Sequence, residues 1–104
     1  MVEFKKIQKF SEKEFELIKI TQDVREFVEN SKVRNGVVFV IVSHTTAGIM
    51  VNESLPCLER DIETKLEELV PLHHDYAHSH FLPSYGAIGG NAPGHLKSML
   101  CGNH

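Results

Sequence analysis

The segment 37–42 constrains the fold more than any other part of the chain. It holds six consecutive β-branched or aromatic residues, Val-Val-Phe-Val-Ile-Val, with no polar residue between them. A run of this kind is typical of a strand that is covered on both faces. The sequence therefore predicts a β-sheet with cover on either side of this strand.

Three further segments are expected to complete that sheet. Residues 4–10 mix apolar with charged side chains and are expected to form a half-buried strand, and residues 15–20 can return antiparallel to them after a turn. Residues 47–52 follow 37–42 after a short polar break and are expected to be its partner or its continuation. These segments are therefore the expected strands of the chain.

Three helices are predicted from caps and apolar spacing. Thr21 can cap a first helix, which ends before Asn35-Gly36 because both residues tolerate positive φ. Pro56 suits the first turn of a second helix with one apolar stripe of Leu58, Ile62, Leu66 and Leu69.

The third helix is expected over residues 94–101. Pro93 opens it and Gly102 ends it. Between the second and third helices, residues 71–93 lose apolar periodicity and are rich in Pro, Gly, His and Ser. A loop of this length in a small domain is usually functional or mobile.

Composition excludes several classes of protein. With 104 residues, 41% apolar and 24% charged, the chain suits one folded domain over residues 1–104 and is not disordered. A net charge of −3 disfavours nucleic-acid binding. No apolar run is long enough to span a bilayer, and the N-terminus lacks a signal peptide, so we expect a cytoplasmic protein with no membrane partner. Cys57 and Cys101 lack CxxC spacing and are expected to be small buried residues.

The histidines are the main chemical signal. Five of the seven lie between His73 and His95. A catalytic zinc needs three protein ligands and one open position. His44 follows a predicted buried strand, and His95 lies in the first turn of the last helix, where the helix dipole favours the neutral, metal-binding imidazole. His74, His78 and His80 compete for the third position, and spacing alone does not choose among them.

Four other polar residues are candidates for the site. Asn52 shares a face with His44 if residues 44–52 stay extended, and Glu53 could be a general base or a partner of a ligand histidine. Lys97 and Ser98 follow His95 on the last helix and could bind an anion. Each has a structural alternative, because helix flanks are normally polar and a carboxylate near a helix N-terminus is stabilised by the dipole. Asp61 is expected to be solvated.

The chain resembles the YjbQ-like family of mostly uncharacterised proteins. The resemblance is carried by Ser-His-Thr-Thr-Ala-Gly-Ile-Met-Val-Asn-Glu at 43–53, Asp-Ile-Glu at 61–63, Tyr-Ala-His at 76–78 and Asn-Ala-Pro-Gly-His-Leu-Lys-Ser at 91–98, with Leu100 and Gly102. It implies an α+β fold with an antiparallel β-sheet and two to three helices, assembled as a trimer. It also implies a divalent metal, zinc, held by His44, His78 and His95. Family members normally continue past the position matching Gly102 through further strands, so this chain is short at its C-terminal end.

The resemblance also implies an activity. Family members support thiamine-phosphate synthase activity, a transfer that couples two small phosphorylated molecules, and this activity is regarded as secondary. Two alternatives stay open: a metal-dependent hydrolase, and a non-catalytic oligomeric metal-binding protein.

Overall fold

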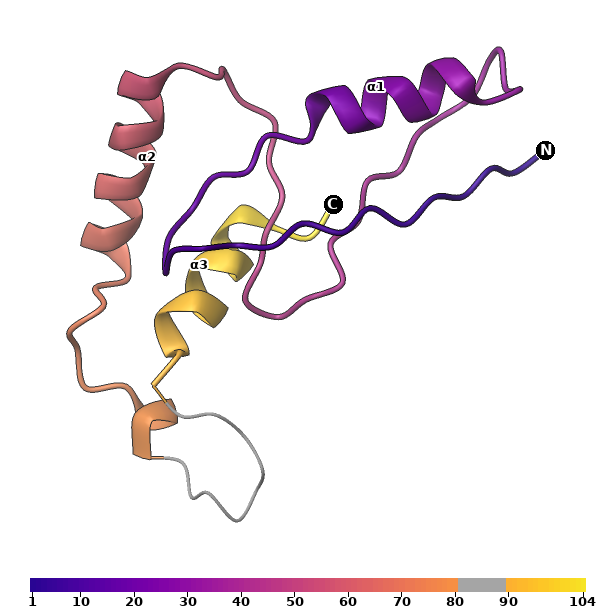
Figure 1. Cartoon of the computed structure of the whole chain (residues 1–104). Helices are drawn as coiled ribbons and strands as arrows, with labels where there is room; N and C mark the ends of the chain where they lie inside the picture. The colour runs from indigo at the N-terminus through magenta and orange to yellow at the C-terminus, as the bar shows by residue number, and fades with distance from the viewer. Residues whose placement is uncertain (81–89) are drawn as a thin grey trace. The chain divides into compact units, whose positions relative to one another are not determined.

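The structure is a computed structural model that describes residues 1–80 and 90–104. It contains two units, Met1–Val40 and Ile41–His104, which we describe separately. The elements in chain order are α1 (Thr21–Asn30), α2 (Pro56–Leu69), the 3₁₀ helix η1 (Ala77–His80) and α3 (Ala92–Cys101), as labelled or coloured in Figure 1. The prediction of one domain over the whole chain stays a prediction.

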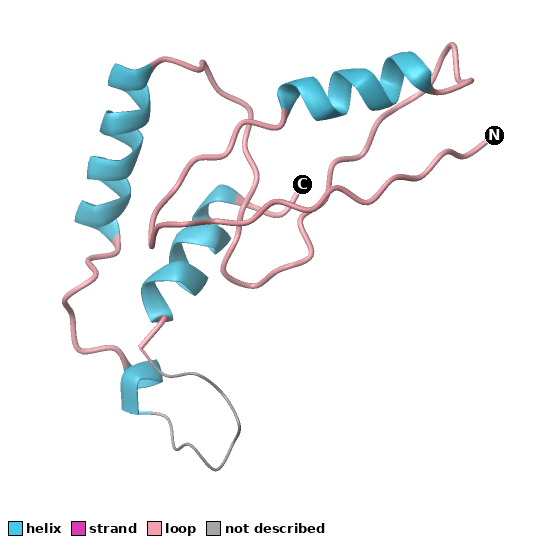
Figure 2. Cartoon of the chain, in the orientation of Figure 1, coloured by secondary structure: helices cyan, strands magenta, loops and turns pink. Residues whose placement is uncertain are grey.

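The predicted antiparallel sheet, and with it the α+β class, is wrong. The part of the chain that the structure describes has helices and no strand (Figure 2). Segments 4–10, 15–20, 37–42 and 47–52 run outside any sheet. The physical reason is that β propensity only says which side chains suit a covered, pleated surface, whereas a strand exists when its backbone pairs with a second extended segment.

Two isolated backbone hydrogen bonds take the place of a ladder. The Val42 N–H donates to the Asn103 carbonyl and the Ile49 N–H donates to the Gly102 carbonyl, each at 2.9 Å. Both connect the extended chain to the residues that follow α3. Without a sheet to cover them, apolar side chains of the segment 37–42 stay exposed, Val37 at 79% and Phe39 at 78%.

The unit Met1–Val40 contains α1 and local polar contacts. The helix begins at Thr21, and its N-cap is Ile20, so the prediction that Thr21 is the cap is wrong. The helix ends at Asn30, where Ser31 turns to an extended conformation and both its N–H and its hydroxyl donate to the Val28 carbonyl. A serine that satisfies a last-turn carbonyl ends the helix earlier than the glycine signal predicted.

The unit Ile41–His104 contains both predicted later helices. α2 begins at Pro56 as expected, and α3 extends from Ala92 to Cys101 with a proline in its first turn. Gly102 caps α3 with φ of 90°, a conformation that favours glycine. Both helix predictions are confirmed. Val70 and Ala92 are the buried apolar residues of the core within the described residues.

Gly48 packs closely against the end of α3. A Cβ atom at this position would lie 2.7 Å from the Cys101 Cβ, 3.0 Å from the Gly102 oxygen and 3.1 Å from the Ser98 oxygen. The absence of a side chain at Gly48 therefore permits the contact between the chain after the 45–46 turn and α3. That turn also interrupts residues 44–52, so the condition under which His44 and Asn52 would share one strand face is not met.

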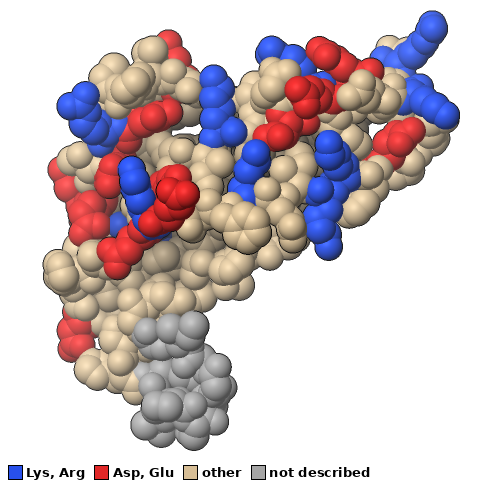
Figure 3. All heavy atoms as spheres, in the orientation of Figure 1, with Lys and Arg blue, Asp and Glu red and all other residues tan. Residues whose placement is uncertain are grey.

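The described surface carries both signs of charge. Acidic and basic side chains are interspersed on the face shown in Figure 3. None of the described helices has the length and apolar character needed to cross a membrane. Cys57 and Cys101 are free, but Cys57 is exposed and Cys101 half-buried, which corrects the prediction that both are buried.

Candidate functional site

A small hollow lies where η1 meets the start of α3. Its volume is about 250 Å³ and its wall is mainly apolar. The hollow is large enough for a small molecule or a few waters, and it contains histidines from two elements. Its lining residues are Tyr76, Ala77, His78, Ala92, His95 and Leu96.

His78 and His95 are neighbours in this hollow. Their ring centroids are 5.1 Å apart and their planes are inclined by 50°. Both side chains are partly buried. Seventeen positions separate them in the sequence, so it is the fold that brings together two of the three predicted metal ligands.

The start of α3 fixes His95. Ala92 and Pro93 are buried, and the Asn91 carbonyl accepts hydrogen bonds from the N–H groups of Gly94 at 3.1 Å and His95 at 3.4 Å. The side-chain oxygen of Asn91 is also buried and accepts no hydrogen bond from any described residue. A buried acceptor of this kind is costly unless a water or a ligand donates to it.

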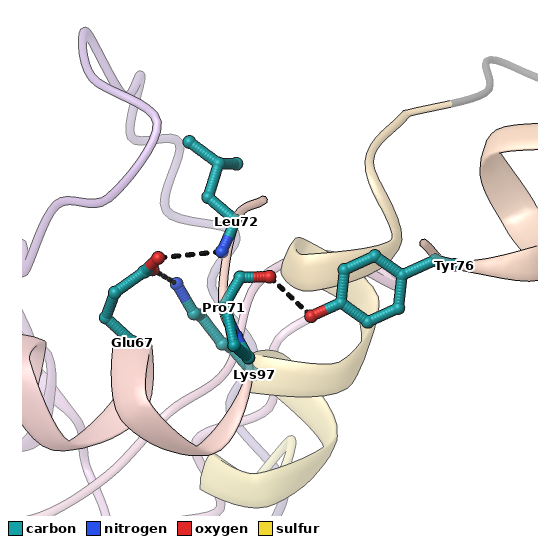
Figure 4. Close-up of polar contacts among 5 residues, drawn as sticks. All are labelled: Glu67, Pro71, Leu72, Tyr76 and Lys97. Carbon is teal, nitrogen blue, oxygen red and sulfur yellow. Dashed lines mark hydrogen bonds and ion pairs between the residues drawn. The ribbon is translucent and has the colours of Figure 1, made fainter. Parts of the chain in front are cut away.

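η1 positions His78 through Tyr76. The Tyr76 hydroxyl donates to the Pro71 carbonyl just after α2 (Figure 4), and the Tyr76 carbonyl accepts the Ser79 N–H at 3.0 Å. The Tyr76 ring lines the hollow and has an edge contact with His74, with centroids 4.9 Å apart. Tyr76 is therefore hydrogen-bonded both to the chain before it, at Pro71, and to η1 after it, at Ser79.

Glu67 and Lys97 join the end of α2 to α3 beside this site (Figure 4). The Lys97 ammonium lies 2.8 Å from Glu67 Oε2, and the Leu72 N–H donates to Glu67 Oε1 at 2.7 Å. The Leu72 N–H and then the Lys97 ammonium lower the pKa of the Glu67 carboxyl. The Lys97 side chain is only 15% exposed, and that of Glu67 is about half exposed.

Ser98 joins the turn that follows His44 to α3. Its hydroxyl contacts two carbonyl oxygens, Thr45 at 2.7 Å and His95 at 2.9 Å. On the other side of the turn, Nδ1 of His44 accepts the Thr46 N–H at 3.1 Å. His44 itself is exposed.

Asn52 and Glu53 lie in the extended chain before α2. Both are exposed, and the Asn52 side-chain oxygen accepts the N–H of Glu53 at 2.8 Å. No described contact joins either of them to the hollow. Asp61 is exposed on α2, as predicted.

The remaining histidines of the loop are exposed. His80 Nε2 lies 2.5 Å from Asp75 Oδ1, and this hydrogen bond is the main cause of the lowered pKa of Asp75. Nowhere in residues 1–80 and 90–104 do three or more His, Cys, Asp or Glu side chains gather closely enough to hold a metal ion. The three-histidine set thus stays a prediction, of which the structure brings together His78 and His95.

Sequence reasoning missed two parts of the site. Leu96 lines the hollow, although only its neighbours His95, Lys97 and Ser98 were candidates, and Glu67 lies on α2 outside the predicted apolar stripe. The Glu67–Lys97 pair spans 30 positions, and no local pattern signals such a contact. Tyr76 could be found, because it precedes His78 in one of the segments that carry the family resemblance.

Comparisons with known proteins agree with that resemblance. The model of the family described as UPF0047 protein YjbQ-like matches residues 5–104. A UPF0047 protein of Methanothermobacter thermautotrophicus is 40% identical over 84% of this chain and 56% of its own length. One from Methanocaldococcus jannaschii is 35% identical over 93% of this chain and 64% of its own length. The UPF0047 protein YugU of Bacillus subtilis is 29% identical over 94% of this chain and 69% of its own length.

The chain thus spans 56% and 64% of the length of the first two relatives. No solved structure matches it. The family model covers nearly every residue, including those of the hollow. The chain therefore belongs to the YjbQ-like UPF0047 family.

Proposed function

We propose that this chain binds a divalent metal ion, zinc, through His78 and His95, and that it acts as an enzyme on a small phosphorylated molecule held in the adjoining hollow. The observation that carries the proposal is the separation of the two imidazole rings. Zn–N distances of about 2.0–2.1 Å and a tetrahedral angle put the centroids of two imidazoles on one zinc about 5 Å apart. The measured separation is 5.1 Å.

His78 and His95 are the two members of the predicted three-histidine set that lie next to each other in the described structure. His78 and His95 come from η1 and from α3, so both are held by backbone that is itself hydrogen-bonded. His44 is committed to another contact through Nδ1. A zinc on the pair would leave positions open for water or a phosphate oxygen, and it would supply Lewis-acid polarisation of that oxygen.

The other residues of the site have roles that follow from their contacts. Tyr76 and Leu96 present apolar surface that excludes water from one side of the hollow. Lys97 holds Glu67 and thereby positions α3, which carries His95, against the end of α2. Glu53 and Asn52 keep their proposed roles, a general base and a polar partner, from the sequence alone, since no described contact joins them to the hollow.

The reaction is proposed only as a class. The family resemblance favours transfer between two small phosphorylated molecules, as in thiamine-phosphate synthesis. A metal-dependent hydrolase of phosphate esters uses the same histidine pair and is the alternative, and a non-catalytic metal-binding homotrimer is the third. No described contact favours the transfer over hydrolysis.

A zinc titration of the tag-free chain tests the proposal. We expect one zinc per chain for the wild type and more than about 100-fold weaker binding for the double variant His78→Ala, His95→Ala, because even a lost partner of a ligand costs 10–100-fold. The matched control is His73→Ala, His74→Ala, which removes two exposed histidines from the same loop and should bind zinc as the wild type does.

Two results would contradict the proposal. One is zinc binding by the His78→Ala, His95→Ala variant with wild-type affinity while its circular dichroism shows a folded chain. The other is loss of binding in the control variant instead. Phosphate release from simple esters, abolished by a chelator, would separate the hydrolase from the transferase.

A further inference from the structure

The wall of the hollow between η1 and α3 contains three rings and three aliphatic side chains. Among the residues that the structure describes, those lining it include no Asp, Glu, Lys or Arg. A charged group that entered from water would lose hydration without gaining a side chain of opposite charge from this wall. The part of a molecule that enters the hollow is therefore expected to be uncharged.

Two alanines on separate elements leave the space open. Ala77 lines the hollow from η1 and Ala92 from α3, and each contributes only a methyl group. Ala92 is 5% exposed and shares a helix face with His95 and Leu96, three and four positions later. The volume of about 250 Å³ exceeds that of a cavity of about 150 Å³ that takes benzene. One substituted six-membered ring therefore fits.

Tyr76 supplies a fixed aromatic surface to this hollow. Its hydroxyl donates to the Pro71 carbonyl, which does not line the hollow (Figure 4). The ring is also held by an edge contact with His74, with 4.9 Å between centroids and 63° between planes. Because the hydroxyl proton is already used, Tyr76 contributes mainly its ring to a bound molecule.

We propose that the hollow binds an uncharged planar ring of a small molecule, which lies against the rings of Tyr76, His78 and His95. Aromatic rings attract one another in offset or edge-to-face arrangements at centroid separations of about 4.5–7 Å, beyond the gain from buried area. The planes of His78 and His95 are inclined by 50°, so the wall offers aromatic surfaces in more than one orientation. The inference deepens the proposed function, on which it rests for the claim that the molecule is a substrate.

Phenol and cyclohexanol are the probes. Both have six carbons and one hydroxyl, but only phenol is planar and aromatic, so the comparison isolates ring contacts from apolar burial. Titrations of the metal-free, tag-free chain followed by NMR should show phenol binding about two- to tenfold more tightly, as expected for one aromatic contact. The methyl signals of Ala77 and Ala92 should shift as phenol is added.

A filled hollow tests the location. Ala77 is exposed, so Ala77→Leu should fold, which circular dichroism checks, while its larger side chain occupies the space. Phenol affinity should fall about tenfold in this variant, because the ring no longer fits without displacing a neighbour. Ser79→Leu is the matched control, since Ser79 is also exposed on η1 but does not line the hollow, and it should bind phenol as the wild type does.

A change at Tyr76 tests the ring contact itself. Tyr76→Phe keeps the ring and loses the hydrogen bond to Pro71, and it should retain the preference for phenol. Tyr76→Leu should bind phenol and cyclohexanol with more nearly equal affinity.

The outcomes are separate from those of the zinc titration. Equal affinity of the wild type for phenol and cyclohexanol overturns the inference, and so does phenol binding that is unchanged in Ala77→Leu. Either result leaves the histidine pair in place. Failure of the wild type to bind zinc overturns the proposed function, whereas the preference for phenol would still support a ring in the hollow.

Discussion

The units Met1–Val40 and Ile41–His104 differ in the range of their contacts. In Met1–Val40 the polar contacts cover short spans, such as the Ser31 hydroxyl on the Val28 carbonyl and the Lys9–Asp23 ion pair, 14 positions apart. In Ile41–His104 they join distant parts of the sequence, such as Ser98 with Thr45, 53 positions apart. All seven histidines also lie in Ile41–His104. The candidate site therefore lies in the unit where residues distant in the sequence are in contact. Only such contacts can hold side chains from separate elements in one place.

The largest expected effect on stability comes from the substitution of Gly48, with a glycine of the other unit as the control. Gly48→Ala should destabilise the chain by about 1–3 kcal/mol, since the new Cβ would meet the Cys101 Cβ at 2.7 Å and two backbone oxygens near 3 Å. Gly36→Ala is the control from the other unit, where the new Cβ would meet only a Val33 methyl at 3.0 Å, at the far end of a side chain. Urea unfolding of both variants measures the difference. Equal free energies of unfolding would remove the distinction between the units.

The next largest effect on stability is expected from the substitution of Ser98, compared with that of Ser31 in the other unit. Ser98→Ala should lower the free energy of unfolding by about 0.5–1.5 kcal/mol, the usual contribution of one hydrogen bond, because it frees the 44–46 turn from α3. Ser31→Ala also removes a hydroxyl from a backbone carbonyl, but one three positions away. We expect Ser98→Ala to cost more and to weaken zinc binding slightly, and Ser31→Ala to leave zinc binding unchanged. A Ser31→Ala effect on zinc would contradict the assignment of the site to Ile41–His104.

Two ion pairs sharpen the same comparison. Lys97→Met should lower the thermal midpoint, because Lys97 is mostly covered and joins α3 to the end of α2 through Glu67. Lys9→Met is the matched change in the other unit, where Lys9 lies 3.0 Å from Asp23 and both side chains are at least a third exposed. A pair of that kind contributes at most about 1 kcal/mol. Calorimetry that gives Lys9→Met the larger effect would reverse the ranking.

The smallest effect is a dependence on pH. The Leu72 N–H and the Lys97 ammonium lower the pKa of Glu67 in the folded chain, so the ionised carboxylate stabilises the fold at pH values above the ordinary glutamate value of about 4.3. This stabilisation is lost as the pH falls through the lowered pKa. Thermal midpoints from pH 7 to pH 3 should therefore fall less steeply in Glu67→Gln than in the wild type. Parallel curves would show that Glu67 is not held in this way.

The helices could be predicted from the sequence, because their signals are local. Pro56 and the apolar spacing after it marked α2, and Pro93 and Gly102 marked the two ends of α3. The sheet could not be predicted reliably from residues 37–42, because pairing depends on a partner segment and not on propensity. In the described chain the Val42 N–H donates a single hydrogen bond, to the Asn103 carbonyl, where a strand would have a ladder.

The candidate site also has parts that the sequence indicates and parts that only the fold reveals. His78 and His95 were singled out through the family resemblance, while their 17-position spacing carries no local signal. The role of Lys97 depends on Glu67, 30 positions away, and is visible only in the fold. The hydrogen bond of His44 is local, from Thr46 to the ring two positions earlier, yet it needs a turn that the predicted strand concealed.

The most direct test of the account is a crystal structure of the tag-free chain with one equivalent of zinc, with data collected at the zinc absorption edge. The account predicts a single anomalous peak about 2.0–2.1 Å from one ring nitrogen of His78 and one of His95. A peak that contacts neither His78 nor His95 would contradict it.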